Sequence, residues 1–186
     1  MRKIILTTNM SLDGLIAGPD GDLDWTAVDD EMHDYYAAVL NQADAILYGR
    51  VMYEMMADYW PTASQDPSLS KSVLEFAHAI NRIRKIVYSR TLDNVGWNTT
   101  VVRTVVPDEI LKMKQQPGRD LLIAGADLAS TFIEHGLIDE YQLLVHPAVV
   151  GSGKPLFKNH RLALKLLKTQ TFHSGAVLLC YEPARK

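Results

Sequence analysis

The chain is poor in cysteine and in long hydrophobic runs. Its 186 residues include one cysteine, Cys180, so the chain can form neither an internal disulfide nor a cysteine-based metal site, and a reducing compartment suits it. The apolar part of the N-terminal stretch MRKIILTTNMSLDG ends at Leu6, which is too short for the core of a signal peptide or for a membrane span. We therefore expect a cytoplasmic protein.

An excess of charge of either sign is also lacking, as is an excess of glycine and proline. The formal net charge is -3, which gives no electrostatic argument for nucleic acid or an anionic membrane as a partner and favours a small-molecule ligand. With 47% hydrophobic and 22% charged residues the chain has the composition of a globular protein. Its length predicts a single domain over residues 1–186.

The sequence does contain two kinds of hydrophobic pattern, one typical of strands and one typical of helices, and they alternate along the chain. Short runs rich in β-branched residues predict strands at residues 3–8, 45–49, 84–90, 99–105, 120–126 and 138–150. Helical spacing predicts helices at residues 29–42, at 107–116, and from Arg50 to just before Tyr59. A further helix is predicted from an Asp66-Pro67 cap to about Ile80. The last predicted helix covers residues 127–136, with Gly136 as its C-terminal cap. The tail, residues 162–182, predicts a β-hairpin that turns at residues 173–175.

Strands that alternate with helices predict an α/β fold of three layers. Its centre is a mixed, mostly parallel sheet with flanking helices, to which the C-terminal hairpin adds antiparallel strands. In such sheets ligands bind beyond the carboxyl ends of the strands. The chemistry of the strand ends therefore decides what the chain can bind.

Three strand ends carry related chemistry. The second predicted strand ends in Tyr-Gly-Arg at Gly49-Arg50, the third in Tyr-Ser-Arg at Ser89-Arg90, and the fifth runs through Gly125 into a helix. Each has an ordinary explanation, because Gly-Arg suits a strand-to-helix turn, an exposed arginine is commonly solvated, and a glycine can simply allow close contact. Taken together, glycine, hydroxyl and guanidinium groups beside helix N-termini favour a phosphate-bearing ligand.

These stretches resemble a known family. The segments SLDGLIAGPDGDLDW, ILYGRVMYE, IVYSR and LLIAGADLASTFIEHGLIDEYQLLVHPAVVGSGKPLF are similar to the dihydrofolate reductase-like fold, and within it to the reductase domain of riboflavin biosynthesis. The resemblance covers nearly the whole chain and implies an NADPH-dependent oxidoreductase. It also implies a homodimer.

The resemblance implies a set of cofactor contacts. Gly49, Arg50 and Val51 would lie along the pyrophosphate and adenosine side of NADPH, and Ser89 and Arg90 would hold the 2′-phosphate. The remaining contacts would be Ile16 and Ala17 over the nicotinamide, in a glycine-rich loop that could act as a lid, and Gly125, Ala126, Asp127 and Leu128 at the pyrophosphate.

Two departures from the family pattern bear on the substrate. Ala126 replaces the second glycine of a Gly-Gly pair, which requires a negative φ there, and Ala124 stands where riboflavin-pathway reductases tend to have glutamate. The preferred substrate is 5-amino-6-(5-phosphoribosylamino)uracil, and a pterin or dihydrofolate-like molecule is the alternative. A second hypothesis is a catalytically silent dimeric ligand-binding protein.

Asp30 is the candidate catalytic residue. Folate enzymes of this fold use one carboxylate on the helix after a Trp-containing loop, and Asp30 follows Trp25 at a similar offset. The acidic run at residues 29–31 is equally what a helix N-terminus collects for its dipole, and Asp13 is interpreted as a turn residue. His33 and His146 have no partner at metal-ligand spacing, so we predict structural roles for them and no metal.

Overall fold

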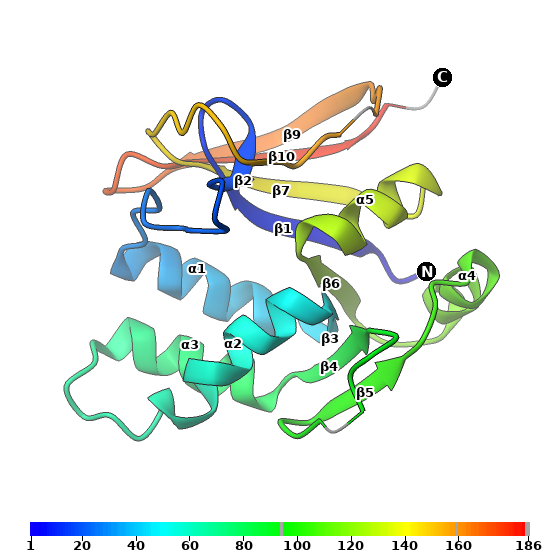
Figure 1. The fold of residues 1–186 in the computed structure, drawn as a ribbon, viewed down its shortest axis with the longest axis horizontal. Coiled ribbons are helices and arrows are strands. Elements are labelled where there is room, and N and C mark those ends of the chain that lie inside the picture. The colour runs from blue at the N-terminus through cyan, green and yellow to red at the C-terminus, as the bar shows by residue number, and fades with distance from the viewer. Residues whose placement is uncertain (94, 159, 185–186) are drawn as a thin grey trace.

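A computed structural model of the chain describes residues 1–93, 95–158 and 160–184. Its main sheet has eight strands in the order β5-β4-β3-β6-β1-β7-β10-β9 (Figure 1). The strands of this sheet are β1 (Ile4–Met10), β3 (Ala43–Gly49), β4 (Arg84–Tyr88), β5 (Thr99–Val102), β6 (Asp120–Ala124), β7 (Glu140–Val145), β9 (Leu164–Thr171) and β10 (Val177–Pro183). The helices are α1 (Asp30–Asn41), α2 (Arg50–Ala63), α3 (Lys71–Arg82), α4 (Pro107–Gln115) and α5 (Ala126–Glu134).

The strand directions confirm the predicted mixed sheet. Strands β5, β4, β3, β6, β1 and β7 pair in parallel, while β10 is antiparallel to both β7 and β9. The hairpin β9–β10 thus extends the sheet with antiparallel strands, and β9 forms its outer edge. The carboxyl ends of β1, β3, β4 and β6 consequently point the same way.

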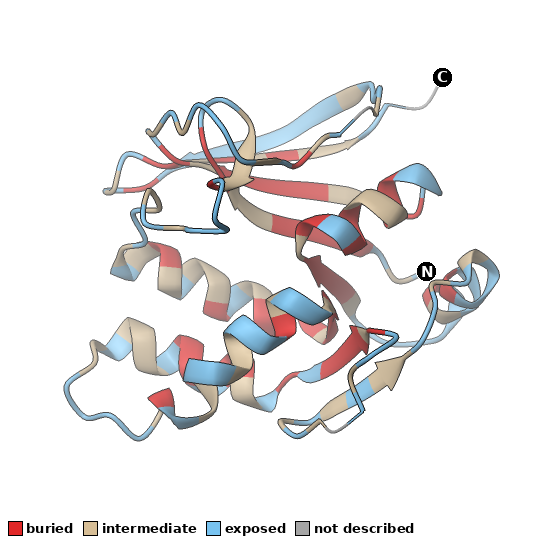
Figure 2. Cartoon of the chain, viewed as in Figure 1, coloured by how far each residue is buried: buried red, intermediate tan, exposed pale blue. Residues whose placement is uncertain are grey.

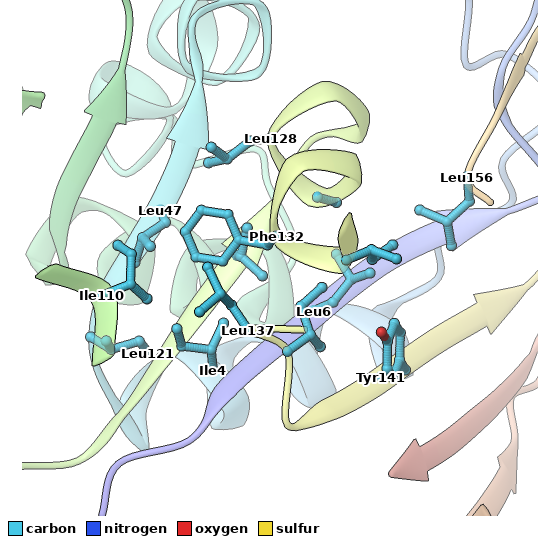
Figure 3. Packing of buried hydrophobic residues seen from close by; sticks show 14 of the residues in the cluster. Ile4, Leu6, Leu47, Ile110, Leu121, Leu128, Phe132, Leu137, Tyr141 and Leu156 are labelled. Atoms are coloured by element: carbon cyan, nitrogen blue, oxygen red, sulfur yellow. The ribbon is translucent and has the colours of Figure 1, made fainter. Parts of the chain in front are cut away.

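Alternation along each central strand separates two apolar layers. Ile4 and Leu6 face α4 and α5, where they pack with Leu121 and Phe132 (Figure 3). The intervening Ile5 belongs to a second cluster, on the face covered by α1, α2 and α3. Figure 2 shows the central strands buried between the two groups of helices, which makes the three predicted layers.

Helix α2 is longer than the sequence predicts, since it continues beyond Pro61 where an end before Tyr59 was expected. A proline inside a helix removes one main-chain hydrogen bond and crowds the preceding turn. Trp60 packs edge-on against Phe76 with ring centroids 4.5 Å apart, and its carbonyl oxygen accepts a hydrogen bond from the side-chain amide of Asn81 at 3.1 Å. These contacts with α3 hold the last turn of α2 in helical form.

The predicted start of α3 at Asp66-Pro67 is wrong. The helix begins at Lys71, and the Ser70 hydroxyl accepts a hydrogen bond from the third helical amide, that of Val73, at 3.3 Å. Asp66 instead accepts hydrogen bonds from the main-chain amide and the hydroxyl of Ser68, at 2.9 and 2.6 Å. Its carboxylate therefore closes a local turn and not a helix cap.

Several strand ends are earlier than predicted. Strand β4 ends at Tyr88 because the next side chain, Ser89, accepts hydrogen bonds from two main-chain amides beyond it and turns the chain. Strands β5, β6 and β7 end at Val102, Ala124 and Val145, and α5 begins at Ala126. The predicted strands therefore extend too far at their C-terminal ends.

A second, two-stranded sheet is not predicted by the sequence. It pairs β2 (Leu15–Ala17) with β8 (Lys154–Pro155) in antiparallel fashion and joins the loop after β1 to the loop after β7. Asp13 adds to this junction, because its carboxylate accepts hydrogen bonds from the amides of Val150 and Gly151 at 3.1 and 2.8 Å.

None of the helices in the described part of the chain is both long enough and apolar enough to cross a lipid bilayer.

Candidate functional site

A cavity of about 1030 Å³ lies where the parallel strands end. Its wall includes the last residues of β1, β3 and β6, the first turns of α2 and α5, the loops after β4 and β5, and residues of α1 and α3. Open α/β sheets place ligands at this position. The volume is at the upper end of the range usual for small-molecule sites.

All the residues that the family resemblance assigns to the cofactor line this one cavity. They come from four separate regions of the chain and are brought together by the parallel order of β3, β4 and β6. The residues are Ile16, Ala17, Gly49, Arg50, Val51, Ser89, Arg90, Gly125, Ala126, Asp127 and Leu128. The geometry thus gathers every predicted contact, although it does not by itself identify the ligand.

The first turn of α2 contributes Gly49 and Arg50. Gly49 precedes the helix with φ -76°, and a Cβ built there would lie 3.8 Å from the Cβ of Leu128, an ordinary contact distance. Neither the backbone nor the neighbouring side chains therefore require glycine at this position. The Arg50 guanidinium pairs with Glu54 at 2.7 Å, one helical turn on, with about half of each side chain exposed.

The first turn of α5 carries a charge cluster. Gly125 has φ 99°, a conformation that favours glycine. Ala126 is the first residue of the helix, so its φ is negative, as the sequence requires for an alanine at this position. Asp127 accepts hydrogen bonds from Lys154 at 2.7 Å and from Lys158 at 3.1 Å. The hydrogen bond from Lys154, followed by that from Lys158, holds the pKa of the Asp127 carboxyl below its usual value.

The loop after β4 is tied to the end of β5 by Arg103, a residue that the sequence reasoning missed. Its guanidinium donates to the carbonyl oxygens of Ser89 at 3.2 Å and Leu92 at 2.8 Å, and pairs with Asp93 at 2.7 Å. Arg103 lines the cavity together with the exposed Arg90. The sequence offered no clear signal for it, because the predicted strand at residues 99–105 includes Arg103, and only the structure ends β5 at Val102.

A buried polar network lies at the end of β1, and its central residue was also missed. Asn9 accepts a hydrogen bond from the Tyr36 hydroxyl at 2.7 Å and contacts Nε2 of His146 at 2.9 Å. Nδ1 of His146 accepts from the main-chain amide of Ala27 at 3.1 Å, so the ring proton is on Nε2 and is donated to Asn9. With its oxygen fixed by two donors, Asn9 keeps its NH₂ group as a donor in the cavity wall.

Burial favours the uncharged form of the residues in this network. His146 is fully buried, and burial lowers the pKa of its imidazole in spite of the opposing charge of Asp29. Burial likewise raises the pKa of the Tyr36 hydroxyl. Among the described residues, the hydroxyl of Thr7, which precedes Asn9 on the same face of β1, is buried without a hydrogen-bond partner and lines the same cavity.

Away from the strand ends, the cavity continues between the sheet and the helices α1, α2 and α3. We refer to this part as the helical chamber and define it by His33, Tyr36, Met52, Met56, Trp60 and Phe76. The aromatic rings are in contact, with centroid separations of 5.7 Å between His33 and Phe76 and 6.1 Å between Tyr36 and Phe76. His33 thus forms part of the chamber wall.

Asp30 lies outside the cavity lining. Its carboxylate accepts a hydrogen bond from the hydroxyl of Ser70 at 2.5 Å and so connects the first turn of α1 to the cap of α3. The adjacent Asp29 caps α1 through the amide of Met32 at 2.8 Å. Asp30 therefore has a structural partner, and its catalytic assignment stays a prediction.

Within the described residues, no cluster of three or more His, Cys, Asp or Glu side chains could hold a metal.

Comparison with known proteins shows the family of the chain. The model of the RibD C-terminal domain family matches residues 2–178. A protein of Bacillus subtilis (strain 168) described as uncharacterized protein YyaP is 39% identical over 183 residues, which cover 97% of this chain and 94% of that protein.

Solved structures share the fold. A putative riboflavin biosynthesis protein from Shewanella sp. PV-4 superposes with a TM-score of 0.73 at 24% identity, with full coverage of both chains. Acinetobacter baumannii RibD has the same TM-score of 0.73 at 18% identity, and the match covers 99% of this chain and 58% of that one.

Proposed function

The chain belongs to the family of RibD C-terminal domains, and on that basis we propose that it is a reductase that binds NADPH at the carboxyl ends of β3, β4 and β6. The observation that carries the proposal is the convergence of every predicted cofactor contact on one cavity. Those contacts come from distant stretches of sequence that the parallel strands β3, β4 and β6 bring to one edge of the sheet.

The residues present fit such a cofactor. Gly49 is not required by backbone conformation or by neighbouring side chains, and a close approach of a phosphate to the α2 N-terminus gives a reason for it. Arg90, on the loop after β4, supplies a guanidinium where a 2′-phosphate is proposed, and Arg103, which follows β5, adds a second one to the same cavity wall; the planar fork of arginine suits a phosphate dianion. The free amides of the first turn of α5 suit the pyrophosphate.

When bound, NADPH supplies a hydride to an electrophilic carbon. In the proposed site Ile16 and Ala17 cover the nicotinamide end. Their strand β2 is fastened to β8, which keeps this covering segment against the cavity. The side chains of Asn9 and Tyr36 line the adjoining part of the cavity, where they orient the group that is reduced.

Titration with NADPH, followed by nicotinamide fluorescence, tests the proposal. We expect saturable binding, and tighter binding of NADPH than of NADH. Absence of binding of either cofactor would overturn the reductase proposal and return Gly49-Arg50 to ordinary turn chemistry. Binding without oxidation by any reducible compound would favour the silent ligand-binding protein.

The substrate and the oligomeric state remain predictions of the family resemblance, and the cytoplasmic location remains a prediction from the single cysteine and the short N-terminal apolar stretch. One solved relative, from Thermotoga maritima, is named a 5-amino-6-(5-phosphoribosylamino)uracil reductase in its second activity, which makes this compound the natural first substrate to assay. Light scattering of the purified chain tests the predicted homodimer.

A further inference from the structure

We infer that the substrate end of the site accepts an uncharged, flat and largely apolar ring system with one acceptor oxygen, and not a phosphorylated sugar. The inference rests on the proposed function, since it assigns the helical chamber to the substrate and the strand ends to the cofactor. The chemistry of the chamber wall supports this assignment. Methionine and aromatic side chains dominate that wall: Met52, Met56, Trp60 and Phe76 come from α2 and α3.

Positive charge is concentrated away from the chamber. Among the described residues that α1, α2 and α3 contribute to the cavity wall, Arg50 alone is charged. Arg50 begins α2, so at 1.5 Å per residue it lies about 3 Å along the helix axis from Met52, at the strand-end side of the chamber, and about 15 Å from Trp60, and it already pairs with Glu54. The other cations of the wall, Arg90, Arg103 and Lys154, lie at the strand ends.

Two of the three helices around the chamber, α1 and α2, have an excess of acidic residues, whereas α3 carries Lys71 and Arg82 against Glu75. Helix α1 carries Asp30, Glu31 and Asp34 and no lysine or arginine, and α2 carries Glu54 and Asp58 against its single arginine. A phosphate of a ribosyl substrate placed in the chamber would find no lysine or arginine of α1 or α3 in the wall. An anion taken into such surroundings loses its hydration without compensation.

Besides His33, whose Nδ1 contacts the main-chain oxygen of Asp29 at 3.0 Å, the polar groups that reach the chamber come from β1 and suit one neutral acceptor. The Asn9 oxygen is occupied by Tyr36 and His146, which leaves its NH₂ group as a donor. The Thr7 hydroxyl, on the same face of β1, has no acceptor among the described residues. Donors at alternate positions on one face of β1, Thr7 and Asn9, suit a carbonyl or quinone oxygen, which is also the kind of group that accepts hydride at its carbon.

The experiment uses three probes of nearly equal shape. They are 2-acetonaphthone, 6-acetyl-2-naphthoate, which adds a negative charge, and 2-isopropenylnaphthalene, which replaces the carbonyl oxygen with a CH₂ group. Binding of each to the purified chain without cofactor is measured by calorimetry. We expect the ketone to bind at least about tenfold more tightly than the carboxylate, because the anion must be desolvated, and about fivefold more tightly than the alkene, because the donors of β1 are then unpaired.

Variants of Met55 locate the binding. Met55 lines the cavity and is 44% exposed, so Met55→Lys introduces a cation without disturbing the core. This variant should reduce or reverse the preference for the ketone over the carboxylate, whereas the matched control Met55→Leu should retain it. An unaltered preference in Met55→Lys would place the probe elsewhere and overturn the inference.

Two further outcomes separate this inference from the proposed function. Saturable NADPH binding together with a preference for the carboxylate, or for 5-amino-6-(5-phosphoribosylamino)uracil, over the ketone would overturn the substrate class and leave the reductase proposal intact. Binding of the ketone with the expected preferences but no binding of NADPH or NADH would support the ligand class and remove the reductase proposal.

Discussion

The guanidinium of Arg103 donates a hydrogen bond to the main-chain oxygen of Ser89, 3.2 Å away, and so joins the end of β5 to the loop that leaves β4. The same guanidinium reaches Leu92 and Asp93, so one side chain holds the first part of this loop, from Ser89 to Asp93. Arg90 lies within the segment that is held in this way. The orientation of a proposed phosphate contact thus depends on a residue from a different strand.

Arg103→Ala should weaken NADPH binding about tenfold or more, since hydrogen bonds to a charged group each contribute about 1.5–3 kcal/mol. Hydrogen exchange of the amides at residues 89–93 should become faster in the same variant. Arg103→Lys is the matched control, because it keeps the charge but cannot bridge several acceptors with one rigid fork. Full recovery of affinity by lysine would show that charge alone matters and would contradict a positioning role.

Arg90→Ala should weaken NADPH binding by about 1.5–3 kcal/mol and change NADH binding little, because only NADPH carries the 2′-phosphate. Arg50→Ala should weaken both cofactors to similar extents if it faces the shared pyrophosphate. Fluorescence titrations of both cofactors at two salt concentrations measure these effects, and each loss should shrink as salt increases. Glu54→Gln serves as the control, since it removes the partner of Arg50 and leaves its guanidinium in place. Equal affinities of the unmodified chain for NADPH and NADH would contradict the assignment of Arg90.

Asp127→Asn should strengthen NADPH binding by a factor of roughly 1.4 to 5, a range that follows from the usual 0.2–1 kcal/mol of an exposed charge pair. The change removes a negative charge from the first turn of α5 and releases Lys154 and Lys158 toward a bound phosphate. Lys154→Met should have the opposite effect. Weaker binding by Asp127→Asn would mean that its carboxylate, and not the freed cations, contacts the cofactor.

Asp30→Asn tests the sequence-based assignment of the proton donor. Asparagine can still accept the hydrogen bond from Ser70, and Asp30 lies outside the cavity lining, so we expect unchanged NADPH affinity and thermal stability. We also expect unchanged rates of NADPH oxidation across the pH range, with water as the proton source. A loss of oxidation at neutral pH with normal cofactor binding would restore Asp30 as the acid.

Asp13 should make stability depend on pH below about 4. The hydroxyl of Ser11, followed by the amides of Gly151 and Val150, lowers the pKa of the Asp13 carboxyl from 3.8 to about 2. Because the folded pKa is the lower one, the stabilisation is complete above the unfolded value and is lost as the pH falls toward 2. Urea unfolding of the unmodified chain and of Asp13→Asn should differ at pH 5, and the difference should shrink toward pH 2.5. A constant difference would contradict this linkage.

The order of the elements and the chemistry of the strand ends could be predicted from the sequence. Hydrophobic periodicity is a local property, and the alternation of strands and helices implies a parallel sheet whose strands end at one edge. Gly49, Ser89 and Gly125 follow strands, so their convergence on one side of the sheet follows from topology. The ends of elements were less predictable, because the contacts of Trp60 and the turn at Ser89 involve specific partners.

Only the tertiary structure decided which side chains complete the cavity. Arg103 acts on a loop that precedes its own strand, and Asn9 is oriented by Tyr36 and His146, residues far from it in sequence. Asp30 lies at the first turn of a helix in both the prediction and the structure, yet its partner on α3 follows from the relative placement of two helices. Periodicity identifies the face of a helix or strand on which a residue lies, but not which residue of another element it contacts. The residues that line the helical chamber are therefore known only once α1, α2 and α3 are packed on the sheet.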